Sequence, residues 1–477
     1  MKKNYIYNLI VTVFNLLFPV LSFPYAARIL GPSGIGKIQF ISNFAQYFAL
    51  IAALGLPFYG VREIAKVKHD NEKLSKTFSE LILIYLITSV IFTIVFILIV
   101  ISVQRFNVDL KYYNVASLLV LLGFCSIDWF YQGIEQFKLI AIRSVVIKII
   151  SLILLYTLVK SKDDLFLYMI ITVFSFLGNN ILNLIFINKI VKIQLKDLSL
   201  NKHFKPLIFI LASTLSMAMY ALFDTVLMGL LSDEKSVGFY TAGVKISKIT
   251  LPLITSIGAA LVPQISRSFV EDKAQFNRLL QLSFEVIVSI SIPISFGLLA
   301  LAHEMVYVFS GPEFRRSVVP MQILSFLPFL IGMGNVFGVQ VLITANKEKE
   351  MLISVIVGMI ISISGNFLLV PLFREIGASI ANVITEMVVA IMFYYYVKKD
   401  FDVTFNGSVI VKAVLPSLLF VPIIMFVRTV TINPVVVIAV SFSVCSLLYL
   451  ISSLFILKNK QLVFYIKTYF NKGKVSN

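Results

Sequence analysis

The sequence contains very few residues of the types that build metal centres and disulfide frameworks. Its 477 residues include two cysteines and three histidines. Cys125 and Cys445 both lie in apolar runs, which excludes the disulfide framework of a small secreted domain. His69, His203 and His303 lie far apart, and the sequence has neither a Walker A loop nor a nucleophile elbow. We therefore expect no cofactor and no metal, and the sequence supports neither an ATP-driven pump nor a metalloenzyme.

Charged side chains are also scarce, whereas apolar side chains are abundant. Only 14% of the residues are charged, 59% are hydrophobic and the mean hydropathy is +0.94. Because soluble domains are about 45 to 50% apolar, this composition excludes a soluble globule. The apolar runs are about 20 residues long, as in spanning helices, whereas barrel strands alternate over about 10 residues. The sequence predicts an all-α protein that crosses the membrane many times.

Fourteen windows are long and apolar enough to cross a bilayer. Of the 41 basic residues, 28 lie at one set of alternate window ends, 11 at the other and two inside a window. Cytoplasmic loops carry the excess of Lys and Arg, so we predict that both termini are cytoplasmic. The same rule explains the net charge of +17 without nucleic acid. The windows are 5–30, 37–59, 80–103, 112–133, 139–159, 164–187, 206–231, 237–263, 280–302, 317–344, 350–371, 376–397, 408–428 and 433–457.

The window that begins at Val237 contains two lysines at mid-depth. In a continuous helix with a rise of about 1.5 Å per residue, Lys245 and Lys248 would lie roughly 12 and 16 Å inside the apolar segment. Charge at that depth is costly, so we expect it to have a function. A similar helix lies 202 residues earlier, and spacings of four then three place each polar set on one helix face. The corresponding positions are Gly36 and Gly238, Gln39 and Thr241, Asn43 and Lys245, and Gln46 and Lys248.

Further matches extend this repeat over six helices. Arg62 matches Arg267, and the segment 132–138 resembles the segment 340–347, with offsets that grow from 202 to about 209. An even number of helices gives both halves the same orientation, that is, a parallel repeat about an axis along the membrane normal. We predict one six-helix lobe at residues 1–205 and a second at 206–400. Residues 401–477 would then hold helices 13 and 14 and a basic cytoplasmic tail.

Ionisable residues within the windows have a structural and a functional interpretation. Asp224 is close in depth to Lys245, and the two would neutralise each other if they pair, as charges in membranes usually do. Arg28 and Lys248 would still leave a positive cavity.

Two further acidic residues and one basic segment also have possible roles. Asp128 has Lys148 as its candidate partner. Glu386, at mid-depth in its window, is either the residue that couples transport to protons or sodium ions or an inert protonated carboxyl. The segment 60–79 combines apolar residues with five cations, which is typical of a short helix on an anionic lipid surface.

Four stretches of the sequence are typical of a known family. They are Arg28-Ile29-Leu30-Gly31-Pro32, Leu54-Gly55-Leu56-Pro57, Asp128-Trp129-Phe130-Tyr131-Gln132-Gly133 and Val237-Gly238-Phe239-Tyr240. With these stretches the chain resembles, from helix 1 to helix 12, the polysaccharide-biosynthesis flippases of the Wzx type. The resemblance implies the fold of the multidrug/oligosaccharidyl-lipid/polysaccharide exporter superfamily, in which two six-helix lobes face a cavity lined by helices 1, 2, 7 and 8.

The resemblance also implies a cargo. Such flippases move undecaprenyl-diphosphate-linked oligosaccharides across the bacterial cytoplasmic membrane by alternating access, for polysaccharides such as O-antigen. A cationic, amide-rich cavity suits a diphosphate that carries sugar hydroxyls. Helices 13 and 14 resemble the pair that forms a lipid-tail groove in lipid II flippases. We expect membrane lipids and a polysaccharide polymerase as partners. We also expect the protein to be a monomer. The candidate substrate-binding residues are Arg28, Gln39, Asn43, Gln46, Asp224, Lys245 and Lys248.

Three other functions stay open. A cation-coupled multidrug exporter of the same superfamily would have the same fold, although a positive cavity disfavours its usually cationic cargo. A membrane glycan polymerase or ligase generally has large external loops, whereas the longest one expected here, about residues 302–318, is short for a catalytic site. A scaffold without transport activity is the third.

Overall fold

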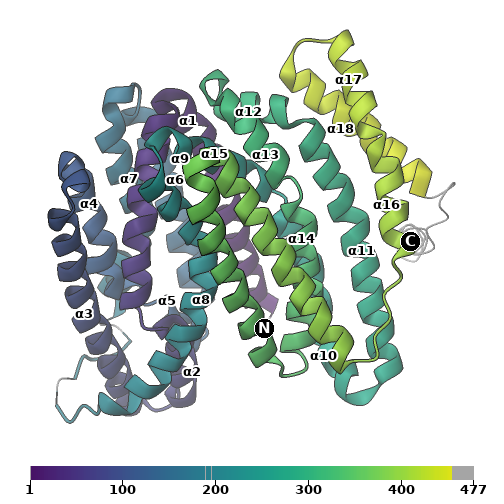
Figure 1. The fold of residues 1–477 in the computed structure, drawn as a ribbon. Helices are drawn as coiled ribbons and strands as arrows, with labels where there is room; N and C mark the ends of the chain where they lie inside the picture. Colours follow the sequence, from purple (N-terminus) through teal and green to yellow (C-terminus); the bar gives the residue numbers. More distant parts are fainter. Residues whose placement is uncertain (1, 188–189, 195, 454–477) are drawn as a thin grey trace, which may run out of the picture. The chain divides into compact units, whose positions relative to one another are not determined.

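The computed structural model describes residues 2–187, 190–194 and 196–453, without the side chains of residues 2–13, 16, 209, 212–222, 257, 259 and 260. The described residues form helices joined by short loops and contain no strand, which confirms the all-α prediction (Figure 1). They divide into two compact units, Met1–Gly238 and Phe239–Asn477. The tail that we expect after Leu457 lies outside the described residues.

The first unit consists of long helices that pack along one another. α1 contacts α3, α4, α6 and α8, and α3 and α4 lie side by side (Figure 1). The helices are α1 (Lys2–Ala52), α2 (Leu56–Val67), α3 (Asn71–Ser102), α4 (Leu110–Leu121), α5 (Asp128–Gly133), α6 (Phe137–Leu158), α7 (Leu165–Ile187), α8 (Asn201–Leu231) and the start of α9 (Glu234–Lys248). Short turns η1 (Gln104–Asp109), η2 (Leu122–Cys125) and η3 (Lys162–Asp164) connect them.

The second unit continues from α9. Its predicted outer loop, about residues 302–318, is itself helical and consists of α12 and η4. Helices 13 and 14 correspond to α16–α18, and Phe420, Ile424 and Tyr449 pack in one apolar cluster with Leu301 beside α12. The elements are α10 (Leu251–Glu271), α11 (Lys273–Ala300), α12 (Ala302–Ser310), η4 (Pro312–Ser317), α13 (Val318–Leu324), α14 (Leu327–Gly334), η5 (Asn335–Ile343), α15 (Glu348–Asp400), α16 (Ser408–Leu418), α17 (Phe420–Val430) and α18 (Pro434–Ile451).

Ten helical segments of the described chain are long and apolar enough to span a membrane, or eleven if the bent pair Glu234–Ser256 and Leu261–Glu271 counts as one span. Two segments exceed the length of one crossing: α1 has 51 residues and α15 has 53. Each is interrupted by a residue with positive φ, Gly31 (φ 68°) in α1 and Arg374 (φ 48°) in α15. Each can therefore hold two of the predicted windows, and the total of fourteen spans stays a prediction.

The outward faces of these helices are apolar, as a lipid-facing surface requires. On α3, Ile94, Leu98 and Ile101 recur at helical spacing and are 53%, 58% and 58% exposed. An extended apolar face of this kind is unusual on a soluble monomer. The chain is therefore a multi-pass membrane protein.

The repeat is visible at the starts of α3 and α11. Asp70 caps α3 by accepting a hydrogen bond from the Lys73 N–H, and Asp272 caps α11 by accepting from the N–H groups of Ala274 and Gln275. An aspartate at this position satisfies amide hydrogens that have no partner inside the helix. The two caps are 202 residues apart, which is the offset found between Gly36 and Gly238.

The structure corrects the predicted continuous helix over residues 237–263. α9 ends at Lys248, and α10 begins only at Leu251. Pro252 explains the break, because its ring would clash with the carbonyl of the residue four positions earlier, which is Lys248. The predicted mid-depth lysines therefore lie at a helix end.

Two other predictions are wrong. The segment 60–79 is no separate helix: residues up to Val67 belong to α2, and residues from Asn71 begin α3. Asp128 does not pair with Lys148. Its carboxylate accepts a 2.7 Å hydrogen bond from Nδ2 of Asn183, while Nζ of Lys148 donates to Oδ1 of Asn15.

Candidate functional site

The polar stripe predicted on the second half of α1 forms a helix face. Gln39, Asn43 and Gln46 lie within one unbroken stretch of helix, and Nε2 of Gln39 donates to Oδ1 of Asn43 at 2.8 Å. Asn43 is 5% exposed, whereas Gln39 and Gln46 are half-buried. The stripe thus offers amide donors and acceptors, and its exposure to a cavity stays a prediction.

Asp224 approaches the same helix from α8. It is 4% exposed, and its neighbour Phe223 packs edge-on against Tyr47 of α1 with ring centroids 5.9 Å apart. The Asp224 carboxylate also interacts electrostatically with Tyr47. Asp224 belongs to the first compact unit and Lys245 to the second, so their ion pair stays a prediction.

Arg28 lies in the first part of α1, three residues before the Gly31 break, and its side chain is exposed. It precedes the polar stripe along the chain by 11 residues. Its contact with cargo stays a prediction.

Lys245 and Lys248 occupy the last turn of α9, and both are half-buried. The last carbonyl groups of a helix carry a partial negative charge that stabilises cations there by about 0.3 to 1 kcal/mol when exposed and more when partly buried. No hydrogen bond or ion pair of its side chain joins Lys248 to another described residue of its unit. The helix end therefore supplies a structural reason for two cations in an apolar segment, and their amino groups can still donate to an anion.

Glu386 lies on α15 and is 8% exposed. Buried polar side chains accompany it on that helix, among them Ser379, Asn382 and Thr385. The hydroxyl of Thr385 donates to the carbonyl of Ala381 at 2.7 Å. This polar environment suits an ionisable carboxyl, and its role in ion coupling stays a prediction.

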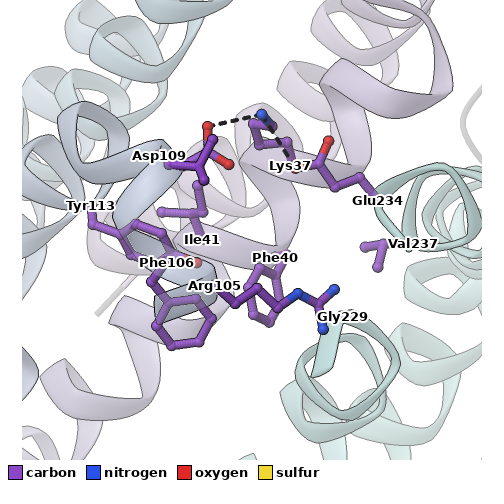
Figure 2. A pocket seen from close by; sticks show the side chains of 11 residues that line it. Lys37, Phe40, Ile41, Arg105, Phe106, Asp109, Tyr113, Gly229, Glu234 and Val237 are labelled. Carbon is purple, nitrogen blue, oxygen red and sulfur yellow. Dashed lines mark hydrogen bonds and ion pairs between the residues drawn. The ribbon is translucent and has the colours of Figure 1, made fainter. Parts of the chain in front are cut away.

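A charged cluster that the sequence did not predict lies just after the Gly31 break in α1, beside a cavity of about 250 Å³ (Figure 2). Nζ of Lys37 is 2.9 Å from Oδ1 of Asp109 and 3.3 Å from Oε1 of Glu234. The Ser33 hydroxyl also donates to Glu234, at 3.1 Å. These contacts join α1 to η1 and to the first turn of α9. They could not be predicted because the partners lie 72 and 197 residues from Lys37.

Arg105 extends this cluster to the end of α8. In Figure 2 its side chain reaches toward Gly229. Its Nη1 donates to the carbonyl of Leu230 at 2.9 Å, and its Nη2 donates to the carbonyl of Ser232 at 2.8 Å. A guanidinium group at this position satisfies carbonyls that have no partner inside the helix. The end of α8 is therefore attached to η1, and the beginning of α9 is attached to α1.

The described part of the chain contains no candidate metal site, because no group of three or more His, Cys, Asp or Glu side chains there could hold a metal ion. The observed chemistry is that of donors and acceptors on membrane helices. These are amides on α1, a buried carboxylate on α8 and two cations at the end of α9. Such groups can bind a polar or anionic ligand.

The sequence matches known proteins along most of its length. The family model described as polysaccharide biosynthesis protein matches residues 1–269. A protein of Escherichia coli (strain K12) described as an O-antigen transporter is 27% identical over 410 residues, which are 84% of this chain and 97% of that protein. The capsular polysaccharide biosynthesis protein CapF of Staphylococcus aureus is 26% identical over 416 residues, which are 84% of this chain and 100% of CapF.

Two solved structures have a similar fold. The lipid II flippase MurJ in an inward closed conformation has a TM-score of 0.73 at 16% identity, and the match covers 96% of this chain and 99% of MurJ. An inward-facing multidrug resistance MATE family transporter of the MOP superfamily has a TM-score of 0.61 at 17% identity, with 82% and 94% covered. At these identities the likeness shows that the chain shares the fold of these two structures.

Proposed function

Because the chain belongs to the polysaccharide biosynthesis protein family, we propose that it is a flippase for undecaprenyl-diphosphate-linked oligosaccharides in the bacterial cytoplasmic membrane. The relatives described by O-antigen transport and by capsular polysaccharide biosynthesis support a lipid-linked glycan as cargo. The fold shared with a lipid II flippase supports translocation as the activity. The cargo would cross unchanged, so the protein acts as a transporter and not as an enzyme.

The observation that carries this proposal is the pair of half-buried lysines in the last turn of α9. Lys245 and Lys248 are one turn apart, and each ammonium group offers three hydrogen-bond donors. Charge-assisted hydrogen bonds to phosphate oxygens are about twice as strong as neutral ones. A diphosphate is therefore the part of the cargo that we assign to these lysines. The sugar hydroxyls would bind the amides of Gln39, Asn43 and Gln46.

The remaining parts of the proposal concern the arrangement in the membrane. We assign both termini to the cytoplasm from the distribution of basic residues. Two six-helix lobes, residues 1–205 and 206–400, would alternate access to the cavity, with Arg28 and Asp224 also in contact with cargo. Glu386 is the proposed coupling residue. The protein would act as a monomer that supplies a polysaccharide polymerase.

A multidrug exporter is the second candidate, because the MATE transporter has the same fold. Its cargo is usually cationic, and the lysines of α9 would repel such cargo. The two functions therefore differ in the charge of the molecule that crosses the membrane.

The proposal is tested with the purified full chain in liposomes that contain a lipid-linked oligosaccharide. The measurement is the fraction of the glycan that an added, membrane-impermeant glycosidase can cleave. A flippase should raise this fraction from about one half to nearly all of the cargo, whereas empty liposomes should stay at about one half. An unchanged fraction, together with uptake of a cationic dye by the same liposomes, would contradict the flippase and favour the exporter.

A further inference from the structure

The segment that connects α7 to α8 is held against the beginning of α3 by hydrogen bonds from its own backbone. The N–H of Gln194 donates to the hydroxyl of Ser79 at 2.8 Å, and the N–H of Lys192 donates to the hydroxyl of Ser75 at 3.3 Å. The N–H of Ser199 donates to Oε1 of Glu80 at 2.8 Å. Residues 190–194 and 196–200 are called the connecting segment below. Its described part therefore follows α3 and ends at the first turn of α8.

At that turn, three buried side chains from three helices form a hydrogen-bonded chain. Nε2 of His203 in α8 is 3.0 Å from Oε2 of Glu80 in α3, and Nδ1 of His203 is 2.8 Å from the hydroxyl of Tyr59 in α2. Tyr59, Glu80 and His203, here called the clamp, are 4%, 0% and 2% exposed. A carboxylate only accepts, so Nε2 of a neutral His203 donates to Glu80 and Nδ1 accepts from Tyr59. Every polar atom of the imidazole is thus satisfied.

The clamp lies close to a bend between α1 and α2. Leu54 and Gly55, which separate these helices, both have positive φ, 49° and 78°. A left-handed backbone at leucine is strained, so the surrounding packing must hold it. That packing comes from α8: a Cβ added to Gly55 would lie 2.7 Å from Cγ2 of Ile210 and 3.1 Å from the backbone nitrogen of Leu211. The bend therefore contacts α8 within three turns of the clamp.

We propose that His203 is a positioning residue that fixes the start of α8 to α2 and α3, so that the bend at Leu54–Gly55 and α8 move as one body during transport. The inference rests on the proposed function for its activity readout only. Without the clamp, α2 would keep its connection to α1 but lose its polar tie to α8. The conformational change would then no longer be shared between α2 and α8.

The described part of the second unit has a comparable docking without a histidine. Gln281, which is 202 residues after Ser79, accepts from the N–H of Asn406 at 3.1 Å. Gln281 also donates to the buried carboxylate of Glu285 at 2.6 Å. Among the described residues, no histidine joins this carboxylate to a third helix. The histidine therefore distinguishes the connection that leads into α8.

The test compares full-length variants in liposomes. His203→Ala removes both ties, whereas His203→Gln keeps a donor that can reach Glu80. Lys202→Ala is the comparison, because Lys202 is half-exposed and contacts the same buried Glu80 carboxylate at 2.7 Å. A buried hydrogen bond to a charged group is worth about a factor of ten or more, whereas a half-exposed lysine contributes less because solvent screens its charge. We expect His203→Ala to slow translocation about tenfold, His203→Gln to restore most of it and Lys202→Ala to slow it less than His203→Ala does.

A second readout tests coupling without any cargo. Trp129 is the only tryptophan in the chain and packs against α2, where a Cβ on Gly60 would lie 2.4 Å from its ring. If the clamp holds α2, His203→Ala should shift the Trp129 emission to longer wavelength and speed hydrogen exchange at residues 52–58.

Three results would overturn the inference. They are an unchanged emission with faster exchange confined to the connecting segment, wild-type translocation by His203→Ala, or equal losses in His203→Ala and Lys202→Ala. If the wild-type protein moves no lipid-linked oligosaccharide, the proposed function fails, whereas the fluorescence and exchange results still decide the clamp.

Discussion

Gly36 and Gly238 meet backbone to backbone where α1 crosses the first turn of α9: a Cβ added to Gly36 would lie 2.7 Å from the backbone nitrogen of Gly238. Reciprocally, a Cβ on Gly238 would lie 2.0 Å from the carbonyl oxygen of Pro32. These glycines occupy equivalent positions in the predicted repeat, 202 residues apart. Each is required because a backbone carbonyl of the other helix, that of Glu234 for Gly36 and that of Pro32 for Gly238, leaves no room for a side chain.

Gly36→Ala should therefore destabilise the protein. The new methyl group would lie 1.7 Å from the carbonyl oxygen of Glu234, and backbone cannot move aside as a flexible side chain can. Overpacking of this kind costs about 1 to 3 kcal/mol, which thermal unfolding in detergent would detect as a lower midpoint. Gly297→Ala is the matched control, since a Cβ there meets no atom within 4 Å. Equal midpoints for the two variants would contradict the close crossing.

Glu304→Gln should loosen α17 from α12. Nε and Nη2 of Arg428 donate to the two carboxylate oxygens of Glu304 at 2.7 and 2.8 Å, and Glu304 is 5% exposed. Hydrogen bonds to a charged group contribute about 1.5 to 3 kcal/mol, so the unfolding midpoint should fall. The exposed pair of Lys66 with Glu63 provides the control, because Lys66→Ala should change stability by less than about 1 kcal/mol. An equal fall of the unfolding midpoint in both variants would contradict a stabilising role for the contact between Arg428 and Glu304.

Labelling of single cysteines should report the orientation of the chain. Lys235→Cys, at the start of α9, should react with an impermeant maleimide added to intact cells. Lys196→Cys, in the connecting segment, should react only after permeabilisation. Both native side chains are exposed, so access depends on the side of the membrane. The opposite pattern would reverse the orientation derived from the basic residues.

The helices could be predicted from sequence because hydropathy records which residues face lipid and core, and the window 139–159 corresponds closely to α6 (Phe137–Leu158). The sequence also predicts the repeat, because Gly36 and Asn43 have counterparts at one offset in Gly238 and Lys245. Pro252 indicates a break in the helix near Lys248, but proline is common in spanning helices, so its presence alone does not predict where a helix ends.

The polar contacts could not be predicted in the same way. Lys37 has equally plausible acids along the chain, and only the fold brings Asp109 and Glu234 to it. Asp128 illustrates the reverse case: the sequence predicts Lys148 as its partner, but Asn183 supplies the hydrogen bond because α7 places it there. Hydropathy determines which helices form, whereas these contacts depend on how each helix is rotated about its axis.

The central claim is that the lysines of α9 bind the diphosphate of the cargo, and translocation by Lys248→Ala tests it most directly. Membrane insertion should be unaffected, because the side chain of Lys248 makes no hydrogen bond or ion pair with another described residue of its unit. Translocation of the lipid-linked oligosaccharide should fall about tenfold or more, as loss of a charge-assisted hydrogen bond predicts. Lys248→Arg should retain part of the activity, since it keeps the charge but not the geometry. Wild-type translocation by a stably inserted Lys248→Ala protein would contradict the claim.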